Sequence, residues 1–439
     1  MSTTVSYAPV GVFSEKMFQC GASIAALRLT DLLARDGVDA FYNFQAKLPG
    51  QEPPAGAMPH VNFSYVSSFL DKRASADVAR AGATCKTLAM RRKLEIIGEK
   101  IRVAMIEQGA RVAHFHNYSG DRETILRIAR QMPFVWTLHD TSPVTGYHYR
   151  MFGLDDKPLE YRAKLLPATE EFWEALKGLP FAFTAPSKWL ADYARMSCPD
   201  FIRVEHIPNA LPEHAFYPME KAHARAVIGL DPSRTYILFF AGKGAWQRKN
   251  FEVLARSLAG EPDLNVNVVV VGGVAEKSLI RDSRLLFLNG FDPIADAARI
   301  TALYNAADAF CISSLVDNLP NTVLEAIHCG RPVIGADTGG VPEMVIDGRN
   351  GWLFNPRDVS SLRLALRRFV HARDRWDAFG AESLKVSAAD YSARKAVGGL
   401  RNLYTELHDM RLRRDIAETA PAATRGAAPS ARGGLLQAV

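Results

Sequence analysis

Two acidic residues eight positions apart, Asp317 and Glu325, lie in a segment whose residue types suit the binding of anions and hydroxyl groups. The Pro-Asn pair between them is typical of a helix start, and the free amides of such an end attract an anion such as a diphosphate. The amides expected there are those of Asn321, Thr322 and Val323. Glu325 would lie one turn inside the helix, where its carboxylate could accept hydrogen bonds from two ribose hydroxyls. Two acids at this spacing also occur on solvated helix faces, so neighbouring segments must decide between the readings.

A glycine-containing basic loop, residues 241–251, follows a strand-like run and precedes a helical pattern. Its Gly242-x-Gly244-x-x-Gln247 spacing imitates a dinucleotide-binding fingerprint, with Glu261 near the place of the ribose acid. Gln247 stands where close packing of the helix needs glycine or alanine, which argues against a nicotinamide cofactor. The same loop can also be read as an ordinary solvated basic loop.

Histidine and serine side chains mark further candidate positions. His139 ends the strand-like run Val-Trp-Thr-Leu-His, and a lone histidine at a strand end is usually only a hydrogen-bonded residue. His114 and His116 are expected to be structural or to lie on the acceptor side. The hydroxyl of Ser314 could reach a phosphate or simply cap the loop that leads to Asp317.

Together these segments resemble family 4 glycosyltransferases of the GT-B fold. The resemblance rests on three segments: D-N-L-P-N-T-V-L-E at 317–325, G-G-V-P-E at 339–343 and W-T-L-H-D at 136–140. Within the family, the first and third segments are similar to those of a branch that acts in capsule and exopolysaccharide assembly. Asp317 takes the first position of the family's paired acids, where glutamate is usual. Cys20 replaces the first glycine of the family's G-G-A-S loop, which leaves Gly21 to approach the diphosphate.

The resemblance implies a role for each matched residue. Glu325 would bind the ribose, Asp317 would face the sugar hydroxyls, and Lys243 and Lys249 would hold the diphosphate, whose growing negative charge a fixed cation stabilises. The implied catalytic residues are His139, Lys249 and Asp317. The implied donor-binding residues are Gly21, Lys243, Arg248, Lys249, Gly273, Asn289, Gly290, Ser314, Asp317, Asn318, Leu319, Pro320, Asn321, Thr322 and Glu325.

The implied reaction is retaining transfer of a sugar from a UDP- or GDP-linked donor to a hydroxyl of a saccharide or lipid-linked saccharide. No D-x-D triplet occurs in the chain, so we expect no metal and no other cofactor. With no enzymic nucleophile in the matched positions, we expect front-side displacement in which the leaving phosphate helps to deprotonate the acceptor. The alternatives are a GT-B epimerase or phosphorylase, a non-catalytic nucleotide-binding relative, and a dehydrogenase.

Alternating strand-like and helical patterns predict the elements that position these residues. The alternation predicts an α/β protein with GT-B architecture, in which two Rossmann-like doubly wound domains face a central cleft. The expected strands include 3–9, 112–116, 134–138, 236–240 and 309–312, and the expected helices include 22–35, 122–131 and 321–329. We predict an acceptor-side domain at 1–211, a donor-binding domain at 212–390, a helix at 391–411 that returns to the first domain, and a disordered tail at 412–439.

Length, composition and charge limit the class of protein. The 439 residues, 48% of them hydrophobic and 23% charged, fit two globular cores. Five scattered cysteines show no metal or redox pairing, and no run is apolar enough to span a membrane, so we expect a cytoplasmic protein without nucleic-acid partners. Residues 72–102 hold nine basic against three acidic residues, so this stretch is either a solvated helix or a peripheral contact with anionic membrane.

Overall fold

The computed structural model describes residues 8–16, 21–46, 62–65, 98–116, 118, 122–145, 169–241, 248–272, 282–288, 291 and 296–419. The strands are β1 (Val10–Lys16), β2 (Ala40–Ala46), β3 (Asn62–Tyr65), β4 (Val112–Phe115), β5 (Phe134–Thr137), β6 (Phe181–Ala185), β7 (Arg203–His206), β8 (Tyr236–Phe240), β9 (Asn267–Val271), β10 (Leu285–Leu288), β11 (Ala309–Ile312), β12 (Val333–Ala336) and β13 (Gly351–Phe354). The helices are α1 (Gly21–Arg35), α4 (Arg122–Gln131), α5 (Ser142–Thr145), α6 (Glu170–Leu176), α7 (Lys188–Ser197), α8 (Lys221–Ile228), α9 (Phe251–Ala259), α10 (Ala297–Ala306), α11 (Asn321–His328), α12 (Val341–Met344), α13 (Val359–His371), α14 (Trp376–Asp390) and α15 (Ala393–Thr419).

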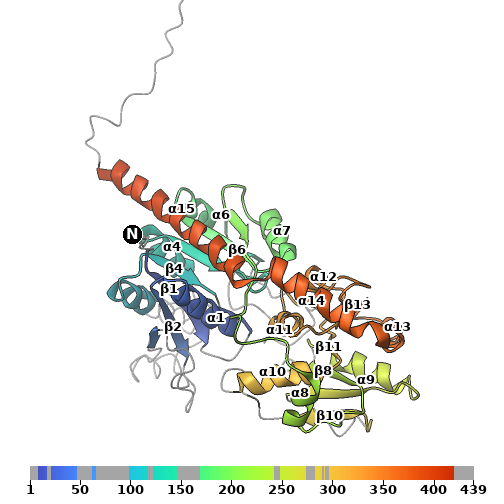
Figure 1. Cartoon of the computed structure of the whole chain (residues 1–439). Coiled ribbons are helices and arrows are strands. Elements are labelled where there is room, and N and C mark those ends of the chain that lie inside the picture. The colour runs from blue at the N-terminus through green and yellow to red at the C-terminus, as the bar shows by residue number, and fades with distance from the viewer. Residues whose placement is uncertain are drawn as a thin grey trace, which may run out of the picture.

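Two parallel sheets organise the described residues. The first has seven strands in the order β3-β2-β1-β4-β5-β6-β7, and the second has six in the order β10-β9-β8-β11-β12-β13. In each sheet the strand order reverses direction beside the first strand of its unit, which is the topology of a doubly wound α/β fold. Figure 1 shows the two sheets in separate lobes. The predicted fold class of two doubly wound α/β units is therefore confirmed.

Buried strands explain why these sheets form. Strands β4, β5, β6, β9 and β11 are buried at every position, and their apolar runs are covered by helices on both faces. Parallel strands end at one edge of their sheet, so the loops after them meet there. Strand β5 leads into His139, and β11 leads into the loop that contains Asp317. Both predicted halves of the site therefore lie at such edges.

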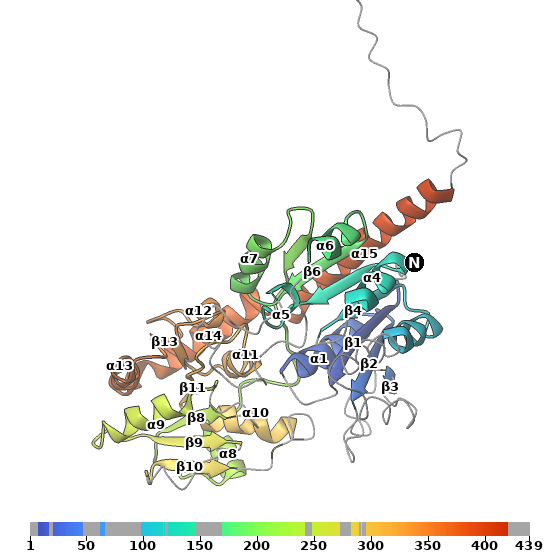
Figure 2. The ribbon, with the colours of Figure 1, turned by 180° about the vertical axis from the view of Figure 1, so that it is seen from behind.

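The last helix packs on the first sheet although it follows the second. The buried residues of α15, from Ala396 to Leu407, belong to the same core cluster as Val10 and Val12 of β1 and Leu27 of α1. Figure 2 shows α15 running along the lobe of the first sheet. Helix α15 also continues through Thr419, so residues 412–419 are helical and not part of the predicted tail. Ion pairs at helical spacing, Arg411 with Asp415 and Arg414 with Glu418, support this extension.

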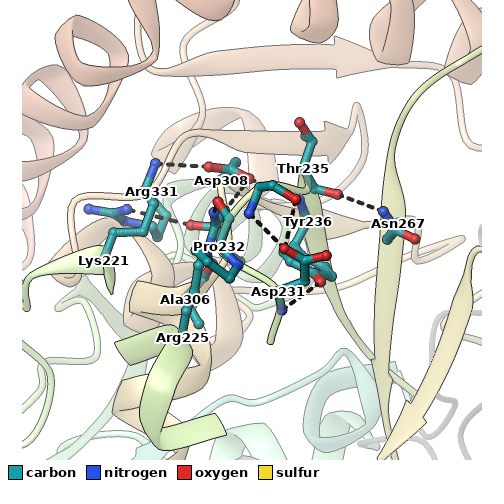
Figure 3. A network of polar contacts seen from close by, with 12 residues as sticks. Lys221, Arg225, Asp231, Pro232, Thr235, Tyr236, Asn267, Ala306, Asp308 and Arg331 are labelled. Atoms are coloured by element: carbon teal, nitrogen blue, oxygen red, sulfur yellow. Dashed lines mark hydrogen bonds and ion pairs between the residues drawn. The ribbon is translucent and has the colours of Figure 1, made fainter. Parts of the chain in front are cut away.

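A buried carboxylate fixes α8 against the second sheet, on the side away from the loops after its strands. Asp308 Oδ2 accepts hydrogen bonds from Arg225 Nη2 at 2.8 Å and from the Tyr236 amide at 2.9 Å, and Oδ1 lies 2.8 Å from Lys221 Nζ. Figure 3 shows this network. Arg225 also donates to the carbonyl of Ala306, so one guanidinium joins two helices and a strand.

Some sequence-based expectations need correction or lie outside the described part. Of the predicted strand 3–9 only residues 8 and 9 are described, and neither belongs to a strand, because the buried run that pairs with β2 and β4 begins at Val10 and Pro9 has no amide to donate. Most of the basic stretch 72–102 and residues 420–439 lie outside the described residues. Among the helices that the structure describes, none combines the length and apolar character that crossing a bilayer requires.

Candidate active site

Helix α11 begins at Asn321, directly after Pro320, as the sequence predicts. Only some of its N-terminal amides are available to donate a hydrogen bond to a ligand. The amide of Val323 donates to the Pro320 carbonyl at 3.0 Å, so it is not available to a ligand, contrary to the prediction. Asn321 and Thr322 are partly exposed at the end of the helix, where amides have no carbonyl partner within the helix. An anion at this end would therefore meet those two amides.

The Asp317 carboxylate lies in a basic environment. Its Oδ2 atom lies 2.7 Å from Lys249 Nζ and 3.1 Å from Arg248 Nη1, and it accepts a hydrogen bond from Ser314 Oγ at 3.1 Å. Burial by itself would raise the pKa of Asp317, but the two cations and the hydroxyl lower it to about 2. Asp317 is therefore ionised at neutral pH, and Ser314 holds this carboxylate.

The loop carrying Asp317 and Asn318 packs directly on the Gly-Gly pair of 339–343. A Cβ atom on Gly339 would lie 1.8 Å from the carbonyl oxygen of Asp317, and one on Gly340 would lie 2.0 Å from that of Asn318. The Gly340 amide also donates to the Asp317 carbonyl at 3.2 Å. Only glycine allows this approach, so the resemblance at 339–343 has a physical basis in the position of the acidic loop.

Lys249 lies in the basic loop between β8 and α9. Because β8 is the neighbour of β11 in the sheet, the Lys249 side chain reaches the acidic loop that follows β11. Burial and nearby Arg248 lower the pKa of Lys249, while Asp317 opposes this shift. The hydroxyl of Ser313 donates to the carbonyls of Lys249 and Asn250, and Asn250 takes a left-handed conformation with φ of 52°, which asparagine tolerates better than most residues. These contacts fix the Lys249 backbone next to the loop after β11.

Glu325 lies on α11 between partners from both lobes. Its Oε2 accepts a hydrogen bond from Tyr304 on α10 at 2.7 Å, and its Oε1 lies 2.8 Å from Arg28 Nη2 on α1. The side chains of Arg28 and Glu325 are each 9% exposed. The sequence predicts Glu325 at the site but neither of these two partners. The available signal for Arg28 was a charged residue at helical spacing between apolar Ala25 and Leu32.

His139 meets the acidic loop through its backbone. Asn318 Nδ2 donates to the carbonyls of Leu138 and His139 at 3.2 and 3.3 Å, and Ser187 at the start of α7 donates its hydroxyl proton to Asn318 Oδ1. The loops after β5 and β11 therefore touch, although 179 positions separate Asn318 from His139. The structure thus brings together predicted site residues from both sheets.

A row of buried histidines supports the His139 side chain. Its Nε2 lies 2.9 Å from His116 Nδ1, and the rings of His116 and His114 lie 4.5 Å apart. His114 in turn contacts Tyr404 of α15 at 2.6 Å and Thr137 at 2.7 Å. Burial lowers the pKa of His139 to about 4, that of His114 to about 3 and that of His116 well below its usual value. The three rings are neutral at pH 7, so His139 can accept a proton or orient a ligand but carries no charge.

The N-termini of two helices from different lobes meet at Asn321. Its side-chain amide donates to the Gly21 carbonyl at 3.0 Å, and its Oδ1 accepts a hydrogen bond from Asn209 at 3.2 Å. Figures 1 and 2 show α1 and α11 next to each other between the lobes. Both helix ends carry partial positive charge, so the region near Asn321 favours an anion.

Further contacts close the interface near the site. Both oxygens of Glu343 accept hydrogen bonds from α7, from the amides of Lys188 at 2.8 Å and Trp189 at 2.7 Å. A carboxylate of the second lobe therefore caps a helix of the first. The side chain of Leu319 is buried in the core of the second lobe, and its predicted contact with a ligand stays a prediction. Four predicted residues, Lys243, Gly273, Asn289 and Gly290, lie outside the described part of the chain.

These contacts define a site in which the basic groups and the acidic groups suit different parts of a ligand. Two cations and two helix ends suit a diphosphate, and the carboxylates of Asp317 and Glu325 suit hydroxyl groups. The backbone of His139, in the first lobe, meets the acidic loop through Asn318. Lys249 and Arg248 supply the positive charge that an anion at this site would meet.

Comparisons with known proteins agree with this chemistry. Residues 235–372, which lie in the second lobe, match the family described as Glycosyl transferases group 1. D-inositol 3-phosphate glycosyltransferase from Rhodococcus jostii is 30% identical over 204 residues, which are 43% of this chain and 44% of that protein. A sulfoquinovosyl transferase from Arabidopsis thaliana is 23% identical over 379 residues, which are 70% of this chain and 74% of that protein.

Solved structures share the whole fold. Sucrose-phosphate synthase from Thermosynechococcus elongatus superimposes with a TM-score of 0.71 at 17% identity, covering 92% of this chain and 99% of that one. HepE from Anabaena in complex with UDP gives a TM-score of 0.62 at 15% identity, covering 91% and 100%. These likenesses show the two-domain GT-B architecture. The chain spans under half of the length of the D-inositol 3-phosphate glycosyltransferases that it matches.

Proposed function

We propose that this chain, whose residues 235–372 match the glycosyl transferases group 1 family, is a retaining glycosyltransferase that uses a nucleotide-sugar donor. One observation carries the proposal. Asn318 of the acidic loop donates to the carbonyl of His139, so the donor-type segment and the predicted first-domain residue form one site. In support, HepE was solved with UDP and with UDP-glucose. We therefore propose a UDP- or GDP-linked donor.

Each residue has a role in the proposed donor complex. The diphosphate would lie between Lys249 and the start of α11, with Lys243 and Gly21 on either side, and Glu325 would accept hydrogen bonds from the ribose. Asp317 would accept hydrogen bonds from the sugar hydroxyls. Gly273, Asn289 and Gly290 would contact the base through their backbone.

The proposed reaction is a front-side displacement without a metal ion. The bond between the anomeric carbon and the phosphate oxygen breaks while the acceptor oxygen bonds to the same face of that carbon. The acceptor proton passes to the leaving phosphate, and Lys249 stabilises the charge that this phosphate gains. Neutral His139 would orient the sugar and support its developing positive charge. Transfer that persists after dialysis against EDTA supports this mechanism, whereas loss that magnesium or manganese restores contradicts it.

We propose a saccharide or lipid-linked saccharide as the acceptor, in polysaccharide biosynthesis. In support, WaaG, a structural neighbour with a TM-score of 0.60, is described as a glycosyltransferase of lipopolysaccharide biosynthesis. Contact of residues 72–102 with anionic membrane stays a prediction. Liposome co-sedimentation tests it, and binding that is unchanged when Arg91, Arg92 and Lys93 become glutamate would contradict it.

Isothermal titration calorimetry with UDP, GDP, ADP and their sugars tests the proposed donor site. We expect one nucleoside diphosphate to bind well and the others weakly. The Lys249→Ala variant should bind it less tightly, and Lys221→Ala, which changes a lysine in the Asp308 network, should bind it normally. Absence of binding by all three nucleotides would contradict the proposed function. An absorbance spectrum of bound nicotinamide would instead favour a dehydrogenase.

A further inference from the structure

Arg28 enters the predicted ribose site from the opposite domain. It lies on α1, which packs on the first sheet, yet its Nη2 atom contacts Glu325 of α11 at 2.8 Å. The guanidinium also lies over the ring of Phe216, 5.1 Å from its centroid, in the core of the second lobe. The Arg28 side chain therefore crosses the interface and is buried against residues of the donor-side domain.

The ion pair of Arg28 with Glu325 offsets the negative charge of this carboxylate. An ionised carboxylate next to a bound diphosphate would repel it, and burying that carboxylate without a partner is costly. Arg28 neutralises Glu325, and Tyr304 holds the second carboxylate oxygen at 2.7 Å. A carboxylate has about four acceptor positions, so two positions stay open for ribose hydroxyls. Arg28 and Tyr304 thus fix the carboxylate without using all of its acceptor capacity.

The guanidinium also has an unused donor. The Nη1 atom of Arg28 is buried and has no hydrogen-bond partner among the described residues. A buried donor without an acceptor is unfavourable, and native proteins rarely leave one unpaired. An oxygen of a ligand bound next to Glu325 would satisfy it.

We propose that Arg28 is a nucleotide-binding residue supplied by the first domain, which holds Glu325 through Nη2 and donates through Nη1 to a ribose hydroxyl oxygen. The ribose subsite is then built from α1, α10 and α11 across both domains. Nucleotide affinity and domain closure become coupled, because Arg28 reaches Glu325 only when α1 lies against α11. This inference rests on the proposed function.

The test combines substitutions of Arg28 with removal of the ribose hydroxyls from the ligand. Calorimetry would measure binding of UDP, or of whichever nucleoside diphosphate the wild type prefers, and of its 2′,3′-dideoxy form to wild type, Arg28→Ala and Arg28→Lys. In the wild type we expect removal of the two hydroxyls to weaken binding about tenfold or more. Arg28→Ala should bind the ribose form more weakly and should discriminate between the two ligands less than wild type does, because Glu325 alone then meets the hydroxyls. Arg28→Lys keeps the charge but replaces the planar guanidinium, whose Nη1 and Nη2 lie apart, by a single nitrogen that would have to reach Glu325 and the ribose from one point, so it should discriminate less than wild type.

Arg35→Ala is the matched control, because Arg35 lies on the same helix and pairs with Asp31 of that helix. It should keep wild-type affinity and discrimination. Full discrimination by both Arg28 variants, measured on protein that melts as the wild type does, would overturn the role of Arg28 while leaving the proposed function intact. A wild type that binds no nucleoside diphosphate would instead overturn the proposed function and this inference with it.

Discussion

The Nζ atom of Lys249 lies 2.7 Å from Oδ2 of Asp317. The sequence assigns the first residue to a diphosphate and the second to a sugar, yet the two form one partly buried ion pair, with side chains 15% and 14% exposed. An ammonium group has three donors, so Lys249 can hold Asp317 and a phosphate oxygen at once. The pair therefore ties the position of the sugar-binding carboxylate to that of the cation beside the leaving group.

Replacing Lys249 tests the role of this cation. The negative charge on the phosphate grows as the glycosidic bond breaks, so Lys249→Ala should mainly lower kcat. The loss of a charge-assisted hydrogen bond is worth roughly 1.5–3 kcal/mol, or about ten- to more than a hundredfold in rate. Steady-state kinetics at saturating acceptor measure it, with Lys221→Ala as the control. A normal kcat in folded Lys249→Ala protein would mean that the diphosphate is held elsewhere.

Replacing Glu325 should change a different constant. The ribose does not change during transfer, so its hydrogen bonds are equally strong in the bound ground state and in the transition state. Glu325→Gln should therefore raise the donor KM and leave kcat close to the wild-type value. The same kinetic series measures both variants. A fall in kcat at unchanged KM would show that Glu325 acts on the reacting atoms instead.

The Asp308 network should matter for stability and not for the donor. Asp308→Asn leaves Arg225, whose side chain is 7% exposed, without its buried counter-ion. Breaking such a pair costs about 3–5 kcal/mol of unfolding free energy. Urea denaturation should show this loss, whereas Glu123→Gln, which changes an exposed ion pair, should show little. Nucleotide affinity of the folded Asp308→Asn protein should equal that of the wild type, and a selective loss of affinity would contradict the structural role.

The buried histidines predict a loss of stability in mild acid. Their pKa values are lowered in the folded protein, to about 4 for His139 and about 3 for His114, so the unfolded chain binds more protons below its own histidine pKa. Stability should fall as the pH drops from about 6.5 towards the folded pKa values, by about 1.4 kcal/mol per pH unit for each titrating ring. Thermal unfolding at pH 7 and pH 5 measures the effect. His114→Asn should show a smaller fall than wild type, and an equal fall would contradict the assignment to His114.

Local sequence signals predicted much of the fold. Helix α11 follows from the Pro-Asn start, and β8, β9, β10 and β11 follow from short apolar runs bounded by turn residues. The acidic loop and the Gly-Gly pair could be recognised because their requirements are local: a helix end, and glycines at a close backbone contact. The sequence predicts the start of helix α15 correctly. It predicts a disordered tail for the final turns, which are helical and carry ion pairs.

Contacts between domains could not be predicted in the same way. Arg28 and Glu325 are separated by 297 positions, and no spacing rule connects them. The Glu343 cap on α7 likewise depends on how closely the lobes approach. These contacts follow from the packing of whole domains, so only the structure reveals them. Within the first domain, the contact of His116 with His139 depends on the order of β4 and β5 in the sheet, which no local spacing gives.

The central claim is that this chain breaks the bond between a sugar and a nucleoside diphosphate. The most direct measurement is release of nucleoside diphosphate from a panel of UDP- and GDP-sugars, with and without added saccharide acceptors, for wild type, Lys249→Ala and the control Lys221→Ala. We predict release from one donor that increases with a suitable acceptor, falls at least about tenfold in Lys249→Ala and is unchanged in Lys221→Ala. Release that is equal in all three proteins, or absent for every donor that binds, would contradict the account.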